Sequence, residues 1–389
     1  MPVTARYPLA TSTWDDKEIA AMQDVIRSGN FTMGPRVAEF ERRFAEFMGS
    51  RYAVMSNSGS SANLLMVGSL FFVKDDPLRP GDEVIVPAVS WSTTYYPLQQ
   101  YGLRLRFVDI DLGTLNYDLD ALASAVSDQT RLIMAVNLLG NPNDFDRICA
   151  VIGDRRIRLI EDNCESMGAE FGGRKAGTFG LMGSFSSFFS HHISTMEGGL
   201  TVTDDEELYH LMLSLRSHGW TRNLPAENRV VPRGDDPFLE SFRFVLPGYN
   251  LRPLELSGAV GLEQLQKLPT LISERRKNGA IWQDAMADHP ELMIQKEIGH
   301  SSWFGFSLVI REGSGWTRPM LLESLAGRGF ETRPIVAGNF TRNEVMRFVD
   351  AEIHGSLDAA DRAHFDGLFI GNHHYPMTDA IEVVKTLRR

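Results

Sequence analysis

Arg131-Leu-Ile-Met-Ala-Val-Asn137 and Arg158-Leu-Ile-Glu-Asp162 are two short apolar runs, and together they decide the fold that this sequence predicts. Each run is closed by a polar residue, a pattern typical of a strand that is buried on both faces. Upstream, Glu83-Val-Ile-Val-Pro87 is a further apolar run that ends in a loop, Leu105-Arg-Phe-Val-Asp109 is another closed by a polar residue, and the amphipathic segment 118–126 follows them. Because strands that alternate with helices need crossover connections, we expect a mostly parallel, buried sheet.

Helices and a second, smaller region are predicted outside this sheet. A helix begins after Thr13 and runs to about Ser28, and another follows Pro35, with Val37, Phe40, Phe44 and Phe47 on one face. Beyond a Pro/Gly-rich loop at residues 246–253, the pattern predicts a long helix from about residue 254, a strand at 302–310 and a helix at 318–327. We therefore predict an α/β protein with a large domain at residues 1–250 and a smaller α+β domain at residues 251–389.

The composition is that of a globular protein with an acidic surface. The 389 residues are 43% hydrophobic and 23% charged, and the formal net charge is −11. This charge argues against a nucleic-acid-binding protein. The longest nearly apolar run, residues 64–73, is too short to cross a bilayer, and the N-terminal residues carry no secretory signal. We therefore expect a cytoplasmic protein with no membrane segment.

Only two cysteines are present, Cys149 and Cys164. Two thiols build neither a disulfide framework nor a four-cysteine metal site. We expect both to be buried, reduced side chains, and we predict no bound metal.

Three features lie where a parallel sheet binds its ligands, at the carboxyl ends of the strands. The turn Asn57-Ser-Gly-Ser-Ser-Ala-Asn63 opens an apolar helix, and it is either a phosphate site or an ordinary serine cap. Trp91 follows the strand that ends at Pro87, and it either stacks on a planar ring or packs in the core. Asp162 either pairs with a protonated pyridine nitrogen or caps a helix.

A fourth feature is the segment Ser184-Phe-Ser-Ser-Phe-Phe-Ser-His-His-Ile-Ser-Thr-Met-Glu-Gly-Gly199. Its tandem histidines, His191 and His192, stand beside serine-rich turns and before a Gly-Gly break. An imidazole moves protons near neutral pH, whereas a lone histidine in an apolar setting is usually a hydrogen-bonded core residue. The spacing alone names no cofactor.

In their order along the chain, these motifs and Gly248-Tyr-Asn-Leu-Arg252 resemble those of the DegT-type sugar aminotransferases. These are pyridoxal-phosphate enzymes of the aspartate aminotransferase fold, fold type I, and the resemblance covers nearly the whole chain. It implies the following roles: phosphate binding by the backbone of Gly59 and Ser60 and by the Ser186 hydroxyl, ring stacking by Trp91, and a bond from Asp162 to the ring nitrogen. It also implies a homodimer with a shared site, in which Asn250 reaches the phosphate in the neighbouring subunit. Glu165 stands near the reacting centre, where many members have glutamine.

His191 is where the sequence departs from this family, because counting back from Glu197 places it at the family's lysine position. That lysine both binds the cofactor covalently and moves protons, and histidine does only the second. Lys175 lies in a separate Gly-rich turn and cannot replace it. The resemblance therefore implies pyridoxal or pyridoxamine 5′-phosphate bound without a covalent link.

The subgroup with this histidine is the sugar 3-dehydratases. Within it, a narrower resemblance carried by residues 87–97, 137–142 and 191–198 implies removal of the C-3 hydroxyl from a GDP-linked 4-keto-6-deoxy sugar. L-Glutamate is the implied amino donor, and the product belongs to bacterial surface polysaccharides. His218 either contacts the substrate or is structural. Arg333 either binds the nucleotide diphosphate or is a surface arginine.

Three alternatives compete with this hypothesis. An ordinary aminotransferase that makes a 4-amino sugar needs a lysine at position 191, where this chain has histidine. A 3-dehydrase with an iron–sulfur cluster typically needs four cysteine ligands, and this chain has two; we therefore predict no such cluster. A relative without catalysis would have no reason to keep Trp91, Asp162, Ser186 and Asn250 together.

Overall fold

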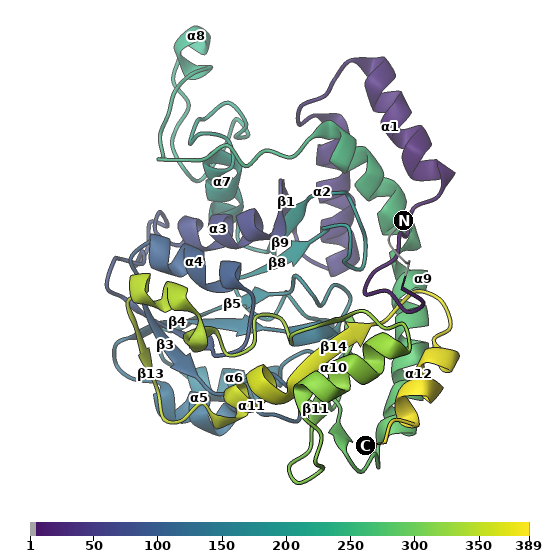
Figure 1. The fold of residues 1–389 in the computed structure, drawn as a ribbon. Helices are drawn as coiled ribbons and strands as arrows, with labels where there is room; N and C mark the ends of the chain where they lie inside the picture. The colour runs from purple at the N-terminus through teal and green to yellow at the C-terminus, as the bar shows by residue number, and fades with distance from the viewer. Residues whose placement is uncertain (1–4, 389) are drawn as a thin grey trace.

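The largest element in the computed structural model, which describes residues 5–388, is an eight-stranded sheet with the order β1-β9-β8-β5-β4-β2-β3-β13 (Figure 1). Its strands are β1 Tyr52–Ser56, β2 Glu83–Pro87, β3 Arg104–Val108, β4 Thr130–Val136, β5 Arg158–Asp162, β8 Met182–Ser186, β9 Gly199–Thr203 and β13 Ala351–Ile353. Strands β8 to β13 in this order pair in parallel, and β9 runs antiparallel to both of its neighbours. The predicted mostly parallel sheet is confirmed.

Helices cover both faces of this sheet, so its central strands are buried. In Figure 1, α3, α4 and α7 lie on one face, and α5 and α6 lie on the other. Their bounds are α3 Gly59–Ser69, α4 Ser92–Gln100, α5 Leu119–Ala125, α6 Phe145–Ile152 and α7 Glu206–Leu215. Neighbouring side chains of β2 alternate between the two cores, since Val84 and Val86 pack toward one and Ile85 toward the other.

The N-terminal helices and a long helix pack together at one end of the sheet. They are α1 Asp16–Ser28, α2 Pro35–Met48 and α9 Glu255–Met286, which continues through Pro269. Val37, Phe40 and Phe44 are buried, as their helical spacing predicted. Phe47 is only half-buried, and the Lys175 ammonium group lies 5.1 Å from the centre of its ring. Lys175 is therefore engaged in a separate turn, the two-stranded hairpin of β6 Glu170–Phe171 and β7 Arg174–Lys175.

A second, four-stranded antiparallel sheet, β10-β11-β14-β12, is built from the C-terminal part of the chain. Its strands are β10 Leu292–Met293, β11 Gly305–Ile310, β12 Thr332–Arg333 and β14 Gly367–Gly371, with helices α10 Arg318–Gly327, α11 Asp358–Asp366 and α12 Thr378–Lys385 and the 3-10 turns η2 Phe340–Arg342 and η3 Glu344–Phe348. Its core includes Trp282 of α9, which stacks on Phe306. The domain division at residue 250 stays a prediction. Strand β13, from beyond that position, extends the large sheet.

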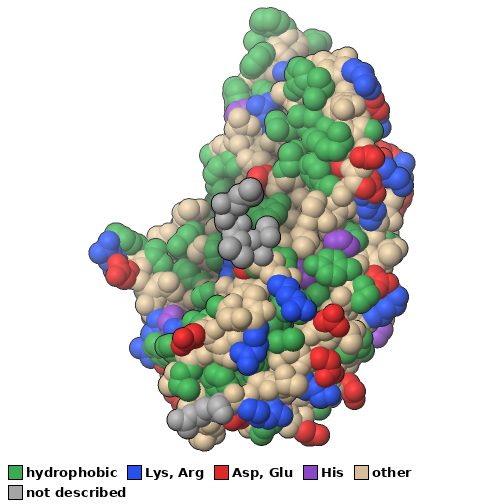
Figure 2. All heavy atoms as spheres, turned by 45° about the vertical axis from the view of Figure 1, so that its right-hand side comes forward, with side chains coloured by type: hydrophobic (Ala, Val, Ile, Leu, Met, Phe, Trp, Pro, Cys, Tyr) green, Lys and Arg blue, Asp and Glu red, His purple; other side chains and the backbone are tan. Residues whose placement is uncertain are grey.

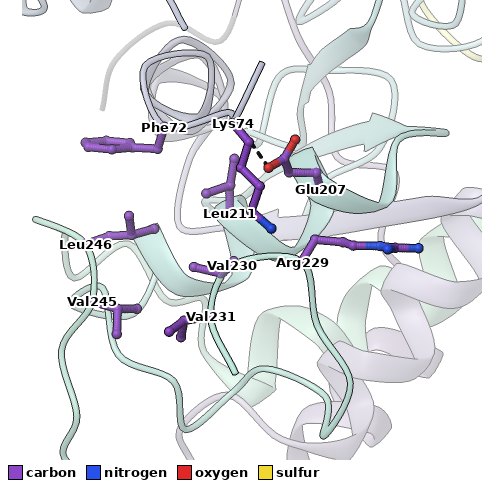
Figure 3. Close-up of a pocket in the computed structure, with 9 residues that line it drawn as sticks. All are labelled: Phe72, Lys74, Glu207, Leu211, Arg229, Val230, Val231, Val245 and Leu246. Carbon is purple, nitrogen blue, oxygen red and sulfur yellow. Dashed lines mark hydrogen bonds between the residues drawn. The ribbon is translucent and has the colours of Figure 1, made fainter. Parts of the chain in front are cut away.

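Residues 222–245 form an arm that projects from the body and carries the short helix α8 Pro237–Glu240 at its tip (Figure 1). The base of the arm lies over α7 and borders a hollow of about 320 Å³. Figure 3 shows Val230, Val231 and Val245 on the arm side of this hollow and Phe72 and Leu211 opposite. The base of the arm is thus attached to the body by apolar contacts.

The cysteine prediction was wrong for Cys149, which is exposed. Helix α6 turns Phe145 and Ile148 toward the sheet, so Cys149, one position further on, lies on the outer face. Cys164 follows β5 and is half-buried, and both thiols are free. Across residues 5–388, no helix is long and apolar enough to cross a membrane.

Candidate active site

Asp162 ends β5 as a buried carboxylate that three hydrogen bonds hold in place. Its Oδ2 accepts from the Asn63 side chain at 2.8 Å and from the Thr94 hydroxyl at 2.7 Å. Its Oδ1 accepts from the backbone N–H of Cys164 at 3.1 Å. A carboxylate has about four acceptor positions, so one direction remains open to a further donor. Asp162 is therefore held in place by its neighbours and keeps one acceptor position for a further donor.

The serine-rich turn is brought against the end of β8. Ser58 caps α3, and Gly59 begins it. A Cβ added at Gly59 would lie 2.6 Å from the Cβ of Ser186 and 2.9 Å from Cys164 Sγ, so only glycine fits there. Ser60 donates to the Thr93 hydroxyl at 2.9 Å, next to Trp91. The free N–H groups at the start of α3 and the Ser186 hydroxyl thus converge, an arrangement that suits a phosphate.

His191 follows β8 in an irregular segment and is half-buried. Its ring lies 5.1 Å from that of Phe304 and 5.9 Å from that of Phe188, and its Nδ1 is buried without a hydrogen-bond partner. Burial, with a smaller contribution from the positive charge of Arg275, lowers the pKa of His191 to about 4. The imidazole is therefore neutral near neutral pH and can accept a proton.

His192 has a different environment. It is fully buried, and its Nε2 lies 3.0 Å from the backbone carbonyl of Ser302. Burial and the nearby Arg275 hold the pKa of His192 well below its ordinary value. This side chain ties the segment of the tandem histidines to the chain that leads into β11, which is a structural role.

Glu165 lies three residues beyond Asp162, and its Oε2 accepts from the backbone N–H of Leu139 at 3.0 Å. Burial raises the pKa of Glu165 to about 7, the Leu139 bond opposes this, and the negative Asp162 adds to it. Leu139 lies in the turn η1 Leu138–Gly140 with a φ of 53°. Its carbonyl accepts from Phe304 N at 3.0 Å, so Glu165 supports the turn that holds Phe304 beside His191.

The remaining predicted residues, Trp91, Asn250, His218 and Arg333, are more exposed than the buried Asp162. Trp91 precedes α4 and is 56% exposed. Asn250 is exposed, and its Oδ1 accepts from Arg252. The backbone N–H of His218 donates to the backbone carbonyl of Tyr249, the residue before Asn250, at 2.5 Å. Arg333 is exposed on the edge strand β12 and pairs with Phe369, whose ring lies 6.4 Å from Phe304.

Three residues that matter here were not predicted from the sequence. Asn63 and Thr94 hold Asp162, and both stand inside the runs that drew attention to the serine turn and to Trp91. Polar side chains in two segments that topology brings to the end of β5 could therefore have been predicted to bind Asp162. Phe304 carried no such signal, because it meets His191 only after the second sheet folds against the first.

A family model for the DegT/DnrJ/EryC1/StrS aminotransferases matches residues 12–388. The chain belongs to this family. Its resemblance to the DegT-type enzymes is thereby confirmed over almost the whole sequence.

Family members similar to this chain include two bacterial proteins that are both named GDP-4-keto-6-deoxy-D-mannose 3-dehydratase. The one from Escherichia coli O55:H7 is 59% identical and covers 97% of this chain and 98% of its own length. The one from Yersinia pseudotuberculosis is 57% identical over 98% of this chain and 97% of its own.

Solved structures of this family agree. A GDP-4-keto-6-deoxymannose-3-dehydratase with a trapped PLP-glutamate geminal diamine is 58% identical, with a TM-score of 0.96 over 98% of this chain and 99% of that one. A histidine-to-asparagine variant of such an enzyme with bound GDP-perosamine has the same identity, coverage and TM-score. The predicted fold type is confirmed.

The residues of this chain fit the phosphorylated pyridine that the family implies. Gly59 leaves open a cradle that a Cβ would fill, with Ser186 at its edge. Asp162 retains one open acceptor direction, and His191 Nδ1 has no partner. Among residues 5–388, no cluster of three or more His, Cys, Asp or Glu side chains is arranged to hold a metal ion.

Proposed function

We propose that this protein removes the C-3 hydroxyl of GDP-4-keto-6-deoxy-D-mannose, with pyridoxal and pyridoxamine 5′-phosphate as its non-covalently bound cofactor. The observation that carries the proposal is the open cradle between Gly59 and Ser186 near Asp162, with His191, whose Nδ1 has no hydrogen-bond partner among residues 5–388, on the segment that follows Ser186. The identity of 57–59% with enzymes of that name supports the choice of substrate. The pathway of a dideoxy sugar in surface polysaccharides follows from that choice.

The pyridoxamine form supplies an amine that joins the keto carbon and a ring that stores electrons while the hydroxyl departs. Asp162 binds the ring nitrogen through its open acceptor direction and holds the ring in register. The N–H groups of Gly59 and Ser60 and the Ser186 hydroxyl bind the phosphate, and Trp91 stacks on the ring. These contacts replace the covalent bond that a lysine would provide.

His191 moves the proton. As a neutral base, His191 would accept a proton at a ring nitrogen, and as imidazolium it would deliver that proton to the departing hydroxyl, which would leave as water. Because the pKa of His191 is about 4, its imidazolium is a strong enough acid to protonate the departing hydroxyl in the second step. Glu165, beside Asp162, contacts the same reacting centre, and His218 and Arg333 contribute to binding of the nucleotide sugar.

We further propose that L-glutamate loads the amino group and that the reaction takes place in the cytoplasm. The proposed homodimer is supported by the apolar tip of the arm, where Phe238 is 82% exposed and Phe242 is 64% exposed. Figure 2 shows hydrophobic side chains gathered on the upper, projecting part of the molecule. Such patches usually mark protein interfaces. In the dimer, Asn250 reaches the phosphate of the neighbouring subunit's cofactor.

The decisive experiment incubates the protein with pyridoxal phosphate, L-glutamate and GDP-4-keto-6-deoxymannose. We expect 2-oxoglutarate, ammonia and a 3-deoxy-4-keto product in equal amounts. A 4-amino sugar in place of ammonia would refute the proposal, and the absence of any turnover would favour a non-catalytic relative. Borohydride treatment followed by mass measurement tests the missing covalent link, because the reduced cofactor should not remain attached to the chain.

The dimer has a separate test. Light scattering should give twice the mass of the 43.6 kDa chain, and replacing Phe238 and Phe242 together by serine should shift the protein toward monomer. Phe365 of α11 is 51% exposed, far from the arm in sequence, and Phe365→Ser is the matched control. If both variants stay dimeric, the arm does not form the interface.

A further inference from the structure

Arg275 of α9 is a buried cation without an ionic partner. Its residue is 5% exposed, and no carboxylate forms an ion pair with it in the part of the chain that the structure describes. Its Nε is buried without a hydrogen-bond partner. Burial lowers the pKa of the guanidinium to about 10, so the group is still charged near neutral pH. Because burying an unpaired charge is costly, this position calls for an explanation.

The contacts of Arg275 lead directly to the active site. Its Nη1 donates to the backbone carbonyl of Phe304 at 3.1 Å and to that of Asn372 at 2.6 Å. Asn372 in turn donates to the carbonyl of Trp303 at 2.9 Å. The backbone that carries the Phe304 ring is thus held from below by α9, and that ring lies 5.1 Å from His191.

We propose that Arg275 is a positioning residue for the reaction: its guanidinium binds the backbone carbonyl of Phe304 and so holds the Phe304 ring against His191, with a buried positive charge close to that contact. The proposal deepens the proposed function, on which its catalytic part rests. This role explains why Arg275 is buried without a carboxylate partner where the four-stranded sheet meets the site.

The consequence for catalysis is that His191 passes on the proton that it accepts and does not retain it. A histidine paired with a carboxylate holds its proton, whereas a histidine that faces a fixed cation releases it. The released proton goes to the hydroxyl that must leave as water. Arg275 therefore favours the second half of the proton transfer, at the expense of basicity in the first half.

Few other titratable or charged groups bear on His191. His192 is its neighbour in the chain, and Arg276 of α9 acts on His192 rather than on His191. The carboxyl groups of the site belong to Asp162, which ends β5, and to Glu165, which follows it, and the two interact with one another. Phe188 and Phe304, the rings that pack on His191, are uncharged. Arg275 is thus the charged residue whose removal should change the titration of His191.

The experiment measures the pKa of His191 by NMR in the full chain labelled with ¹³C-histidine, with and without pyridoxal phosphate, and the missing signal of His191→Asn identifies the resonance. Arg275→Gln should raise the pKa of His191 by about one unit, the size of effect a nearby charge commonly has. Arg275→Lys, which keeps the charge, should stay close to the wild type. Arg276→Gln is the matched control and should leave His191 unchanged.

Kinetics then connect the shift to catalysis. In Arg275→Gln, the acid limb of the pH profile of kcat should move to higher pH by the same amount as the pKa of His191 measured by NMR. KM for the nucleotide sugar should stay within about twofold of the wild type, because Arg275 is buried away from the exposed residues proposed to bind that sugar. Arg275→Lys should restore the profile. A residue with a merely structural role would lower the amount of folded protein without moving the limb.

Two results would overturn the inference: an unchanged His191 titration in Arg275→Gln, or equal shifts in Arg275→Gln and Arg275→Lys. If Arg275→Gln does not fold, Arg275→Met serves, because an apolar side chain often replaces a buried charge without loss of stability. The NMR result is independent of substrate. A shifted titration in a protein that makes no 3-deoxy sugar would therefore refute the proposed function and leave the role of Arg275 in place.

Discussion

Replacing His191 by asparagine should separate chemistry from folding, because asparagine keeps a polar side chain but cannot accept a proton near neutral pH. General bases contribute about 10² to 10⁴ in rate, and we expect kcat for the 3-deoxy product to fall by about that factor. The fold should persist, since Nδ1 of His191 has no hydrogen-bond partner among residues 5–388 and the ring packs against those of Phe188 and Phe304.

The same variant should become less sensitive to acid. The pKa of His191 is about 4 in the folded chain, against an ordinary value of 6.5. The unfolded chain therefore binds a proton at a pH where the folded chain does not, so this residue destabilises the fold as the pH falls from about 6.5 to about 4. The full effect is about 3 kcal/mol, and about 2 kcal/mol of it is present at about pH 5.

Urea unfolding of wild type and His191→Asn at about pH 7.5 and about pH 5 measures this difference. On acidification, the free energy of unfolding of the variant should fall by about 2 kcal/mol less than that of the wild type. Equal acid sensitivity would refute the buried, neutral imidazole, and retention of more than a tenth of the wild-type kcat would refute its role as the base.

Three further substitutions test the rest of the site. His192→Asn should lower stability by about 1–3 kcal/mol through the lost bond to Ser302 O and the space left behind, while kcat of the folded protein stays near wild type; calorimetry and kinetics check this, and a large loss of kcat would contradict the structural role. Gly59→Ala should weaken pyridoxal-phosphate binding by at least about tenfold, because the new Cβ would lie 2.6 Å from that of Ser186 and a lost charge-assisted contact is worth about 1.5–3 kcal/mol. Spectroscopic titration measures the affinity, and Gly327→Ala, whose Cβ would have nothing within 4 Å, is the control. Equal affinities of the two variants would contradict the cradle. Glu165→Gln should gain stability over wild type as the pH rises from about 4.5 to about 7, because the raised pKa of Glu165, about 7, makes ionisation of the folded chain unfavourable there; a pH-independent difference in urea midpoints would contradict the buried carboxyl.

The sheet could be predicted because most of its strands are short apolar runs that can be recognised locally in the sequence. Apolar runs such as residues 131–137 have one interpretation when helical segments separate them, and β4 and β5 lie within one residue of the predicted bounds. The place of β13 could not be predicted in this way. Residues 351–353 are only partly buried, and they join the large sheet because β3 offers a free edge, which is a property of the assembled fold.

The site shows the same division. Asp162 and Ser186 are the last residues of β5 and β8, and Gly59 opens α3, so topology alone brings them to one edge of the sheet. The residues that tune His191 come from elsewhere: Phe304 precedes β11, and Arg275 lies in the middle of α9. Their sequence surroundings are those of ordinary core and helix positions. Contacts between distant segments create their function, and no local pattern records such contacts.

The exchange of lysine for histidine has a consequence for the whole site. A covalent link tolerates loose packing around a cofactor, whereas non-covalent binding depends on every contact. This dependence accounts for the dense bonding around Asp162, where Asn63 also accepts from the Ser184 hydroxyl and thereby joins α3 to β8. It also gives the two histidines separate tasks. His192 Nε2 lies 3.0 Å from the Ser302 carbonyl and fixes the segment, whereas Nδ1 of His191 has no hydrogen-bond partner among residues 5–388 and is available for the proposed proton transfer.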